Sequence, residues 1–203
     1  MTESRISIED RKKIEAGIQE KYSKVAKSPE DQFKYPTGRE GLRKLQYDLS
    51  IIDQLPDDVA SLYCGVGNPF SLGKIHSGEQ ILDIGCGAGV DAIIAAILTG
   101  PNGEAFGVDI VPEMIQQAKS NRDKTGLENV HFRETSGEAL PFGDEVFDAV
   151  ISNGAINLMP DKEKALSEAF RVMKLGGRLM IADQVSSANV QKDIKSRVDS
   201  WFQ

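Results

Sequence analysis

A glycine-rich run between an apolar segment and a helix-compatible segment constrains the fold of this chain more than any other feature. Residues 81–90 read ILDIGCGAGV, so Gly85, Gly87 and Gly89 follow a short apolar run directly. Residues 90–98 suit a helix, and a second apolar run ends in Asp109, twenty residues after Gly89. A strand, a tight glycine loop, a helix and a carboxylate at the next strand end together predict a pocket for a nucleotide-containing cofactor.

The rest of the chain predicts an α/β fold. Strand patterns and helical patterns alternate from residue 80 onward, with strands expected at 80–84, 104–109, 130–133, 146–152 and 177–183 and helices at 90–98, 112–125 and 161–173. Such alternation predicts a mostly parallel sheet between two layers of helices, a three-layer Rossmann-like sandwich. We therefore expect an N-terminal helical cap segment at residues 1–73 and a cofactor-binding domain at residues 74–203.

The N-terminal segment has two helical patterns of its own. Ser7 and Asp10 resemble a capping box, and the apolar residues behind them recur at helical spacing: Ile14, Ile18, Tyr22 and Val25. This helix either docks on the main body or covers the active site as a lid. A second helix is expected at residues 41–55, with Leu42, Leu45, Leu49 and Ile52 on one face. Residues 57–62 suit one further helical turn.

Composition narrows the class of partner. The chain has 203 residues, a net charge of -7 and two cysteines, Cys64 and Cys86. An acidic chain without a basic block repels nucleic acid, and no apolar run approaches the roughly 18 residues that span a bilayer. The N-terminus has no signal-peptide core, and no histidine and cysteine spacing predicts a metal site. A cytoplasmic enzyme that binds a small molecule is the expectation.

The glycine spacing helps to choose the cofactor. Dinucleotide folds use G-x-G-x-x-G, whereas this loop reads G-x-G-x-G and has Val90 at the third dinucleotide position. No basic residue stands near the loop to face a pyrophosphate. S-adenosylmethionine, which has no phosphate, fits better than a nicotinamide dinucleotide, and a dehydrogenase is disfavoured for the same reason.

The motifs DIGCGAG, GVDIVPEMI, EALPF and FRVMKLGGRLMIAD follow in this order between residues 74 and 185. On these motifs the chain resembles the class I S-adenosylmethionine-dependent methyltransferases. The resemblance implies that Asp83 and the amides of Gly85 and Gly87, in the loop that Gly89 ends, hold the methionine end of the cofactor. The other residues that it implies surround the ribose, the adenine and the methyl group: Asp109, Ile110, Met114, Ser136, Gly137, Glu138 and Asn153. One departure is Ser136, where the family usually has an acid, so we expect a modest affinity for the cofactor.

A narrower resemblance is to the arsenite methyltransferase subgroup. The segments GVGNP at 65–69 and ISNGAINL at 151–158 are similar to two cysteine-containing segments of that subgroup. Val66 and Gly154 stand at the two cysteine positions, so arsenic binding by the usual set of thiolates is not supported. The residues expected on the acceptor side are Cys64, Asn68, Asn153 and Asn157, with Cys64, Asn153 and Asn157 as catalytic candidates.

The end of the chain differs from the resembled family, whose sheet has seven strands. Only residues 184–203 follow the fifth strand, which suffices for a helix at 190–202 and not for the last two strands. We expect the fifth strand to form an exposed edge and to favour a homodimer. Two explanations of the ending stay open: a truncation, and a UGA codon after Gln203 that encodes selenocysteine.

Two functions from different classes follow from the sequence. The first is a methyltransferase that uses S-adenosylmethionine to methylate a small acceptor. The alternative is a catalytically silent, cofactor-binding fragment or partner subunit.

Overall fold

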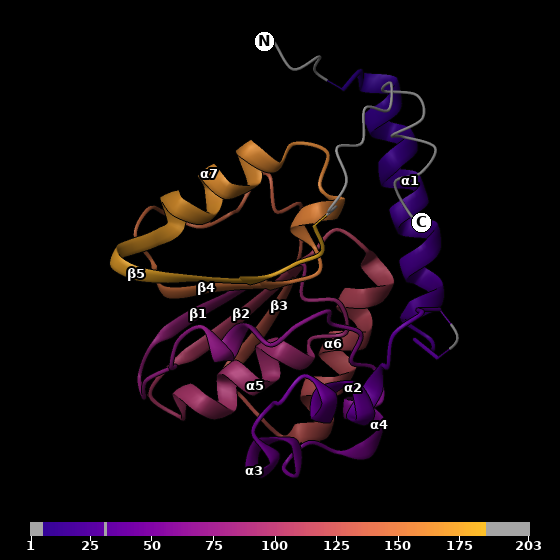
Figure 1. Cartoon of the computed structure of the whole chain (residues 1–203). Helices are drawn as coiled ribbons and strands as arrows, with labels where there is room; N and C mark the ends of the chain where they lie inside the picture. Colours follow the sequence, from indigo (N-terminus) through magenta and orange to yellow (C-terminus); the bar gives the residue numbers. More distant parts are fainter. Residues whose placement is uncertain (1–5, 31, 186–203) are drawn as a thin grey trace.

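Five strands form one parallel sheet at the centre of the molecule (Figure 1). The computed structural model describes residues 6–30 and 32–185. The strands are β1 (Gln80–Ile84), β2 (Glu104–Asp109), β3 (Val130–Glu134), β4 (Phe147–Asn153) and β5 (Met173–Ala182). Their order is β3-β2-β1-β4-β5, and every neighbouring pair is parallel. The chain reverses direction across the sheet between β1 and β4, which is where open α/β sheets bind ligands.

Helices cover both faces of the sheet, which confirms the predicted three-layer fold. Helices α5 (Val90–Thr99) and α6 (Pro112–Thr125) lie on one face, and α7 (Lys162–Val172) lies on the other (Figure 1). Buried apolar side chains fill both layers, among them Ile93 and Ile151 on the α5 side and Leu82 and Phe147 on the α7 side.

The fifth strand begins earlier than the sequence predicts. It starts at Met173 rather than at residue 177, and its pairing with β4 shifts register between Phe147 and Ala149. The extra residues fit because Gly176 has a φ of 78°, a left-handed conformation that glycine adopts without strain.

The N-terminal helix α1 (Ile8–Val25) docks on the main body beside α6. Its first turn is capped as predicted, because the Ser7 hydroxyl accepts the Asp10 amide hydrogen at 3.0 Å. Ile14 and Ile18 are buried in a cluster that includes Met114 of α6. The helix therefore has a fixed position against the domain that carries the sheet.

The prediction of a single helix at 41–55 is wrong. Two short helices, α2 (Gly38–Lys44) and α3 (Leu49–Ile52), flank a break at which Gln46 has a φ of 60°. Asp48 starts the second helix by accepting the Ser50 amide hydrogen at 2.8 Å, and such capping competes with a continuous helix. Ile52 is fully buried, whereas Leu49 is 58% exposed instead of sharing its face.

The remaining short elements complete the cap segment and its junction with the sheet. They are α4 (Asp57–Ala60), which confirms the predicted turn, and the 3-10 turns η1 (Pro69–Ser71) and η2 (Ile156–Leu158). Leu42 and Ile52 share one apolar cluster with Ile81 of β1, so residues on both sides of position 73 pack together. The division at residues 73 and 74 stays a prediction, and the helix expected at 190–202 lies outside the described residues. No described helix combines the length and apolarity needed to cross a bilayer.

The break in the predicted helix gives a matched pair of variants. We expect Ile52→Ala to lower the free energy of unfolding by about 3 kcal/mol, because it leaves a cavity in the core. Leu49→Ala removes an exposed side chain and should change the free energy of unfolding by less than about 0.5 kcal/mol. Urea unfolding followed by circular dichroism measures both. Equal losses in the two variants would mean that one continuous helix buries both side chains.

Candidate functional site

A cavity opens at the carboxyl ends of the strands, across the switch point between β1 and β4. Its empty volume is about 1060 Å³, including open solvent at its mouth, which is enough space for a ligand of nucleoside size. The loops after β1, β2, β3 and β4 form one wall. Side chains of α1 and residues 62–65 form the opposite wall.

Most of the residues predicted for the site line this cavity together. They are Cys64, Asp83, Gly85, Gly87, Asp109, Ile110, Ser136, Gly137, Glu138 and Asn153. The carboxyl ends of parallel strands meet at one edge of a sheet, so loops far apart in the sequence converge here.

Met114 and Gly89 do not line the cavity. Met114 is only 1% exposed, because Ile14 and Ile18 of α1 cover it in the core. Gly89 caps the start of α5 with a φ of 82°, and a Cβ added there would meet the Phe132 ring at 2.6 Å. Gly89 is therefore required for close packing of the loop against β3. The expected place of Met114 beside the adenine stays a prediction, since its Sδ lies 3.9 Å from the Cβ position of Gly87 in the cavity lining.

Asn68 and Asn157 also lie away from the cavity lining, contrary to expectation. The Asn68 side chain caps η1, accepting the Phe70 amide hydrogen at 3.1 Å. Asn157 lies in η2, where its backbone amide donates to the Asp183 carboxylate at 2.9 Å. Local capping fixes the Asn68 side chain, whereas the Asn157 side-chain oxygen is buried without a hydrogen-bond partner.

The backbone amides of Gly85 and Gly87 in the glycine loop donate hydrogen bonds to other groups of the protein. The Gly85 amide donates to the Val108 carbonyl oxygen at 2.8 Å, and the Gly87 amide donates to Asp109 Oδ2 at 2.9 Å. The two amides expected to hold a ligand are therefore engaged in this structure. A Cβ added to Gly87 would have nothing nearer than Met114 Sδ at 3.9 Å, so the loop presents bare backbone to the cavity.

Two buried aspartates lie at strand ends. Asp109 accepts the amide hydrogens of Gly87 and Val111, each at 2.9 Å, while desolvation raises the pKa of its carboxyl. Asp83 is 2% exposed, and its Oδ2 has no hydrogen-bond partner. Desolvation, followed by repulsion from Asp91 and Asp109, raises the pKa of Asp83 well above its ordinary value. An unpartnered buried carboxylate oxygen is costly unless a ligand satisfies it.

Asn153 connects β4 to the wall that carries Cys64. Its Oδ1 accepts the amide hydrogens of Val66 at 2.8 Å and Gly67 at 3.1 Å. Its Nδ2 lies within hydrogen-bonding distance of Asp91 Oδ2 at 2.9 Å and of the hydroxyls of Tyr47 and Tyr63 at 3.1 Å. The Asn153 side chain is therefore occupied in positioning the turn rather than free to bind an acceptor.

Sequence reasoning missed Asp91, which lines the cavity from the first turn of α5. Its carboxylate accepts the Tyr47 hydroxyl hydrogen at 2.8 Å as well as the Asn153 bond. Desolvation raises the pKa of Asp91 to about 6, although the bonds from Asn153 and Tyr47 oppose the shift. One signal was available: Asp91 is the only charged residue in the otherwise apolar segment 90–98.

The α1 helix also contributes residues that the sequence did not indicate. Glu15 and Tyr22 line the cavity beside Ile18. Arg11 Nη1 donates to Glu138 Oε2 at 2.5 Å and so ties α1 to the loop after β3. Docking and covering the site are thus compatible roles for α1, and both predicted alternatives describe part of its position.

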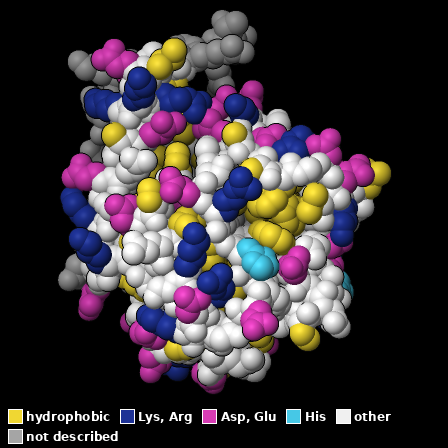
Figure 2. Space-filling view, turned by 180° about the vertical axis from the view of Figure 1, so that it is seen from behind, with side chains coloured by type: hydrophobic (Ala, Val, Ile, Leu, Met, Phe, Trp, Pro, Cys, Tyr) yellow, Lys and Arg dark blue, Asp and Glu magenta, His cyan; other side chains and the backbone are white. Residues whose placement is uncertain are grey.

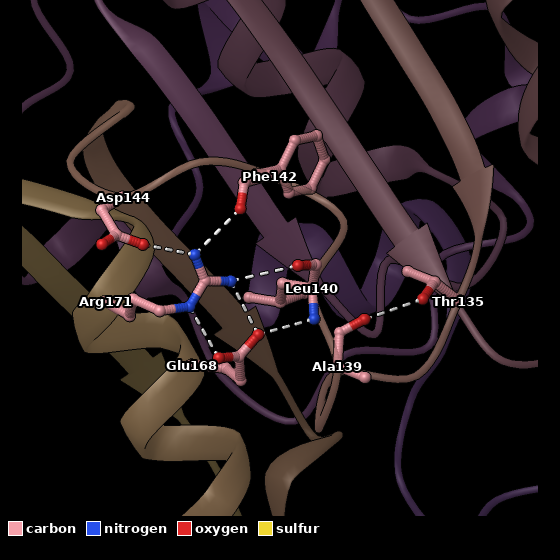
Figure 3. A network of polar contacts seen from close by, with 7 residues as sticks. All are labelled: Thr135, Ala139, Leu140, Phe142, Asp144, Glu168 and Arg171. Carbon is pink, nitrogen blue, oxygen red and sulfur yellow. Dashed lines mark hydrogen bonds and ion pairs between the residues drawn. The ribbon is translucent and has the colours of Figure 1, made fainter.

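Arg171 of α7 holds the loop after β3 from the far side of the sheet (Figure 3). Its guanidinium donates to the carbonyl oxygens of Leu140 and Phe142 and to the carboxylates of Glu168 and Asp144, at 2.7 to 3.1 Å. Glu168 in turn accepts the Leu140 amide hydrogen at 2.8 Å. This network fixes the loop that carries Ser136, Gly137 and Glu138.

Cys64 presents a neutral thiol to the cavity. Desolvation, with the negative charges of Asp109 and Asp91, raises the pKa of Cys64 to about 12. The positions of Val66 and Gly154 are neighbours, since a Cβ on Gly154 would lie 3.2 Å from a Val66 methyl carbon. No group of three or more metal-ligating side chains is gathered in residues 6–30 and 32–185.

Comparison with known proteins decides the family. A family model described as a methyltransferase domain matches residues 75–202, more than half of the chain. The chain belongs to this methyltransferase family. It is a class I, arsenite-methyltransferase-like member, and S-adenosylmethionine is the cofactor of the family.

Similar proteins narrow the subgroup of this methyltransferase domain. An arsenite methyltransferase of Halobacterium salinarum is 40% identical over 164 residues, covering 81% of this chain and 42% of that protein. A Mus musculus arsenite methyltransferase is 32% identical over 201 residues, covering 95% of this chain and 53% of that protein. The solved structure of an arsenic(III) S-adenosylmethionine methyltransferase from Chlamydomonas reinhardtii has a TM-score of 0.61 and 38% sequence identity. The match covers 66% of this chain and 47% of that chain. The chain thus spans about half the length of these relatives.

The raised pKa of Asp91 predicts a pH-dependent stability for the methyltransferase domain. The folded state holds a proton on Asp91 up to about pH 6, whereas an unfolded aspartate loses it near 3.8. Stability from this group is therefore present below pH 4 and is lost as pH rises to 6, by up to about 3 kcal/mol. The free energy of unfolding of Asp91→Asn, relative to that of the wild type, should rise by up to this amount as the pH increases from 4 to 8.

Urea unfolding of both proteins across that range measures the difference. Glu128→Gln, which changes an exposed carboxylate, is the control and should track the wild type at every pH. The raised pKa would be contradicted if the free energies of unfolding of the wild type and Asp91→Asn differed by the same amount at every pH.

Proposed function

We propose that the chain is an S-adenosylmethionine-dependent methyltransferase that methylates a small acceptor in this cavity. The observation that carries the proposal is the convergence of the Asp83 carboxylate, the bare glycine loop and Asp109 at the switch point of the sheet. The unpartnered Asp83 oxygen suits the ammonium of a methionine moiety. Asp109 can accept further hydrogen bonds from ribose hydroxyls, because a carboxylate has about four lone-pair sites.

The remaining predicted residues suit the other parts of the cofactor. Ile110, Ser136, Gly137 and Glu138 line the same cavity, and we propose that they surround the adenine. The Ser136 hydroxyl already accepts the Glu138 amide hydrogen at 3.2 Å, which supports the expectation of a modest affinity. When bound, S-adenosylmethionine supplies an electrophilic methyl group on a sulfonium sulfur.

The contribution of this chain to the reaction is alignment and exclusion of water. Tyr22, Tyr35 and Leu62 close the cavity opposite the sheet, and the Tyr35 hydroxyl fixes the Cys64 carbonyl at 3.0 Å. Holding an acceptor in line with the methyl carbon can lower the barrier by roughly 7–11 kcal/mol. The Cys64 thiol is protonated at neutral pH, so we propose that the acceptor brings its own nucleophilic lone pair.

The residues that line the turn support a proposal about the class of acceptor. Val66 and Gly154 pack against each other where the resembled subgroup has cysteines, so Cys64 is the one thiol that the turn offers the described cavity, and Cys86 of the glycine loop is the other thiol in its lining. A single thiol favours a small thiol or metalloid compound over free arsenite held by several thiolates. Cys64 is the residue that we propose to contact it.

The small-molecule acceptor, the homodimer and the cytoplasmic location are proposals for this chain. The face shown in Figure 2 has interspersed acidic and basic side chains, which favours a small-molecule acceptor over a polyanion. Phe170 of α7 and Leu175 of β5 are 71% and 88% exposed, which favours a homodimer through this part of the surface. A cytoplasmic location rests on composition alone.

Cofactor binding and turnover test the proposal. We expect Asp109→Ala to weaken binding of S-adenosylmethionine by about 10- to 100-fold, because it removes charge-assisted hydrogen bonds. Asp109→Asn keeps the side-chain shape and should weaken binding less, while Glu128→Gln should bind like the wild type. Isothermal titration calorimetry measures all four proteins. Unchanged affinity in Asp109→Ala would contradict the ribose assignment.

Turnover on a panel of thiols and trivalent metalloids separates an enzyme from a silent partner. We expect methylation of at least one panel member, with loss of that activity in Cys64→Ala and retained cofactor affinity. Binding of the cofactor without methylation of any panel member would favour the silent, cofactor-binding alternative.

A further inference from the structure

A second cavity lies between the cap segment and α5, apart from the site described above. Its empty volume is about 720 Å³, including open solvent at its mouth, which is within the range of small-molecule sites. Its walls come from α3, η1, the segment that leads into β1, and α5. It shares no lining residue with the first cavity, so the two are separate places for a ligand.

The interior of this second cavity is apolar. Four aliphatic and two aromatic side chains line it: Ile51, Ile75, Ile94, Leu98, Tyr47 and Phe70. The two aromatic rings meet edge to face, with their centroids 5.9 Å apart. All six side chains belong to the apolar cluster that joins the cap segment to the sheet, so the walls are held by the core. A flat apolar molecule in this space would be removed from water and would gain ring contacts.

The polar groups of the lining carry no net charge. They are Asp48, Asn68 and Lys74, one acid, one amide and one base. The Asn68 carboxamide is already engaged with backbone groups of the cap segment. Asp48 Oδ1 accepts the amide and hydroxyl hydrogens of Ser50 at 2.8 and 2.7 Å, whereas no hydrogen bond within residues 6–30 and 32–185 reaches Asp48 Oδ2. These bonds lower the pKa of Asp48, so its carboxylate is a charged acceptor at neutral pH.

Tyr47 stands between the two cavities. Its ring lines the second cavity, and its hydroxyl donates to Asp91 at 2.8 Å. Asp91 lines the first cavity. Tyr47 is only 5% exposed, so a molecule packed against its ring would restrict the ring and, with it, the hydroxyl that holds Asp91.

We propose that the second cavity binds a small neutral aromatic compound with one N–H or O–H donor, and that its occupancy strengthens cofactor binding through Tyr47. The rings and aliphatic walls suit the aromatic body, and Asp48 Oδ2 accepts the donor. One acid and one base give neither an anion nor a cation an advantage that offsets burial of its charge. The binding site is independent of the proposed function, whereas the link to the cofactor rests on it.

Nuclear magnetic resonance with indole as the probe tests the site. Indole is neutral and has one N–H donor. We expect it to bind the full chain with a Kd of about 0.1–1 mM and to shift amide signals in residues 47–51, 70–75 and 94–98. Indole-3-acetate and tryptamine carry a negative and a positive charge on the same ring system, and each should bind at least about fivefold more weakly. Absence of indole binding, or equal binding of a charged analogue, would overturn the assignment.

A blocking variant locates the bound probe. Leu98→Trp places a bulky side chain in the cavity and should weaken indole binding at least about tenfold, because a filled cavity has no room for the ligand. Leu72→Trp makes the same change at a side chain that is 62% exposed and outside the lining, and it should bind like the wild type. Circular dichroism checks folding, and Ile51→Trp replaces Leu98→Trp if that variant does not fold. Wild-type affinity in the folded blocking variant would overturn the location.

Calorimetry with S-adenosylmethionine tests the link between the cavities. Saturating indole should tighten cofactor binding by about threefold or more, because the first ligand has already ordered Tyr47. Tyr47→Phe keeps the ring and removes the hydroxyl, so it should still bind indole and should lose this effect. Equal cofactor affinity with and without indole would overturn the link. Indole binding by a chain that does not bind the cofactor at all would overturn the proposed function and support the second site.

Discussion

The carboxamide of Asn153 is the contact on which the rest of the site depends. It lies at the end of β4 and joins the turn at Val66 and Gly67 to Asp91 of α5 and to Tyr47 of the cap segment. Each partner is a buried or half-buried polar group that would be costly without a hydrogen bond. One side chain therefore sets the distance between the wall that carries Cys64 and the wall that carries the glycine loop.

The polar network also explains how the protein tolerates its acidic cavity. Desolvation opposes charge on Asp83, Asp91 and Asp109, and backbone amides, a hydroxyl and a carboxamide compensate only part of that cost. Arg171 and Arg11 contribute differently, because they fix the loop after β3 from two sides without entering the cavity. Cations support the walls of the site while the described cavity lining has carboxyl groups and no basic side chain, a separation that suits a positively charged ligand.

Much of this arrangement could be predicted from the sequence. Alternating strand and helix patterns placed the loops after β1, β2 and β4 at one edge, so Gly87 and Asp109 were found from local signals, whereas Asp83 followed from the family resemblance. The cap segment could not be predicted as well. Gln46 and Asp48 break a helix that hydrophobic spacing alone favours, because capping and a left-handed turn override periodicity. The side chains that come from α1 and from Tyr47 depend on tertiary packing, which no local pattern specifies.

The central claim is that S-adenosylmethionine binds between the strand ends and the cap segment. Hydrogen–deuterium exchange, measured on peptides with and without the cofactor, tests it most directly. The account predicts slower exchange at residues 85–88, 109–111 and 135–138 and in the part of α1 that carries Glu15 and Tyr22, with little change in α7. Protection confined to other parts of the chain, or none at a saturating cofactor concentration, would contradict the account.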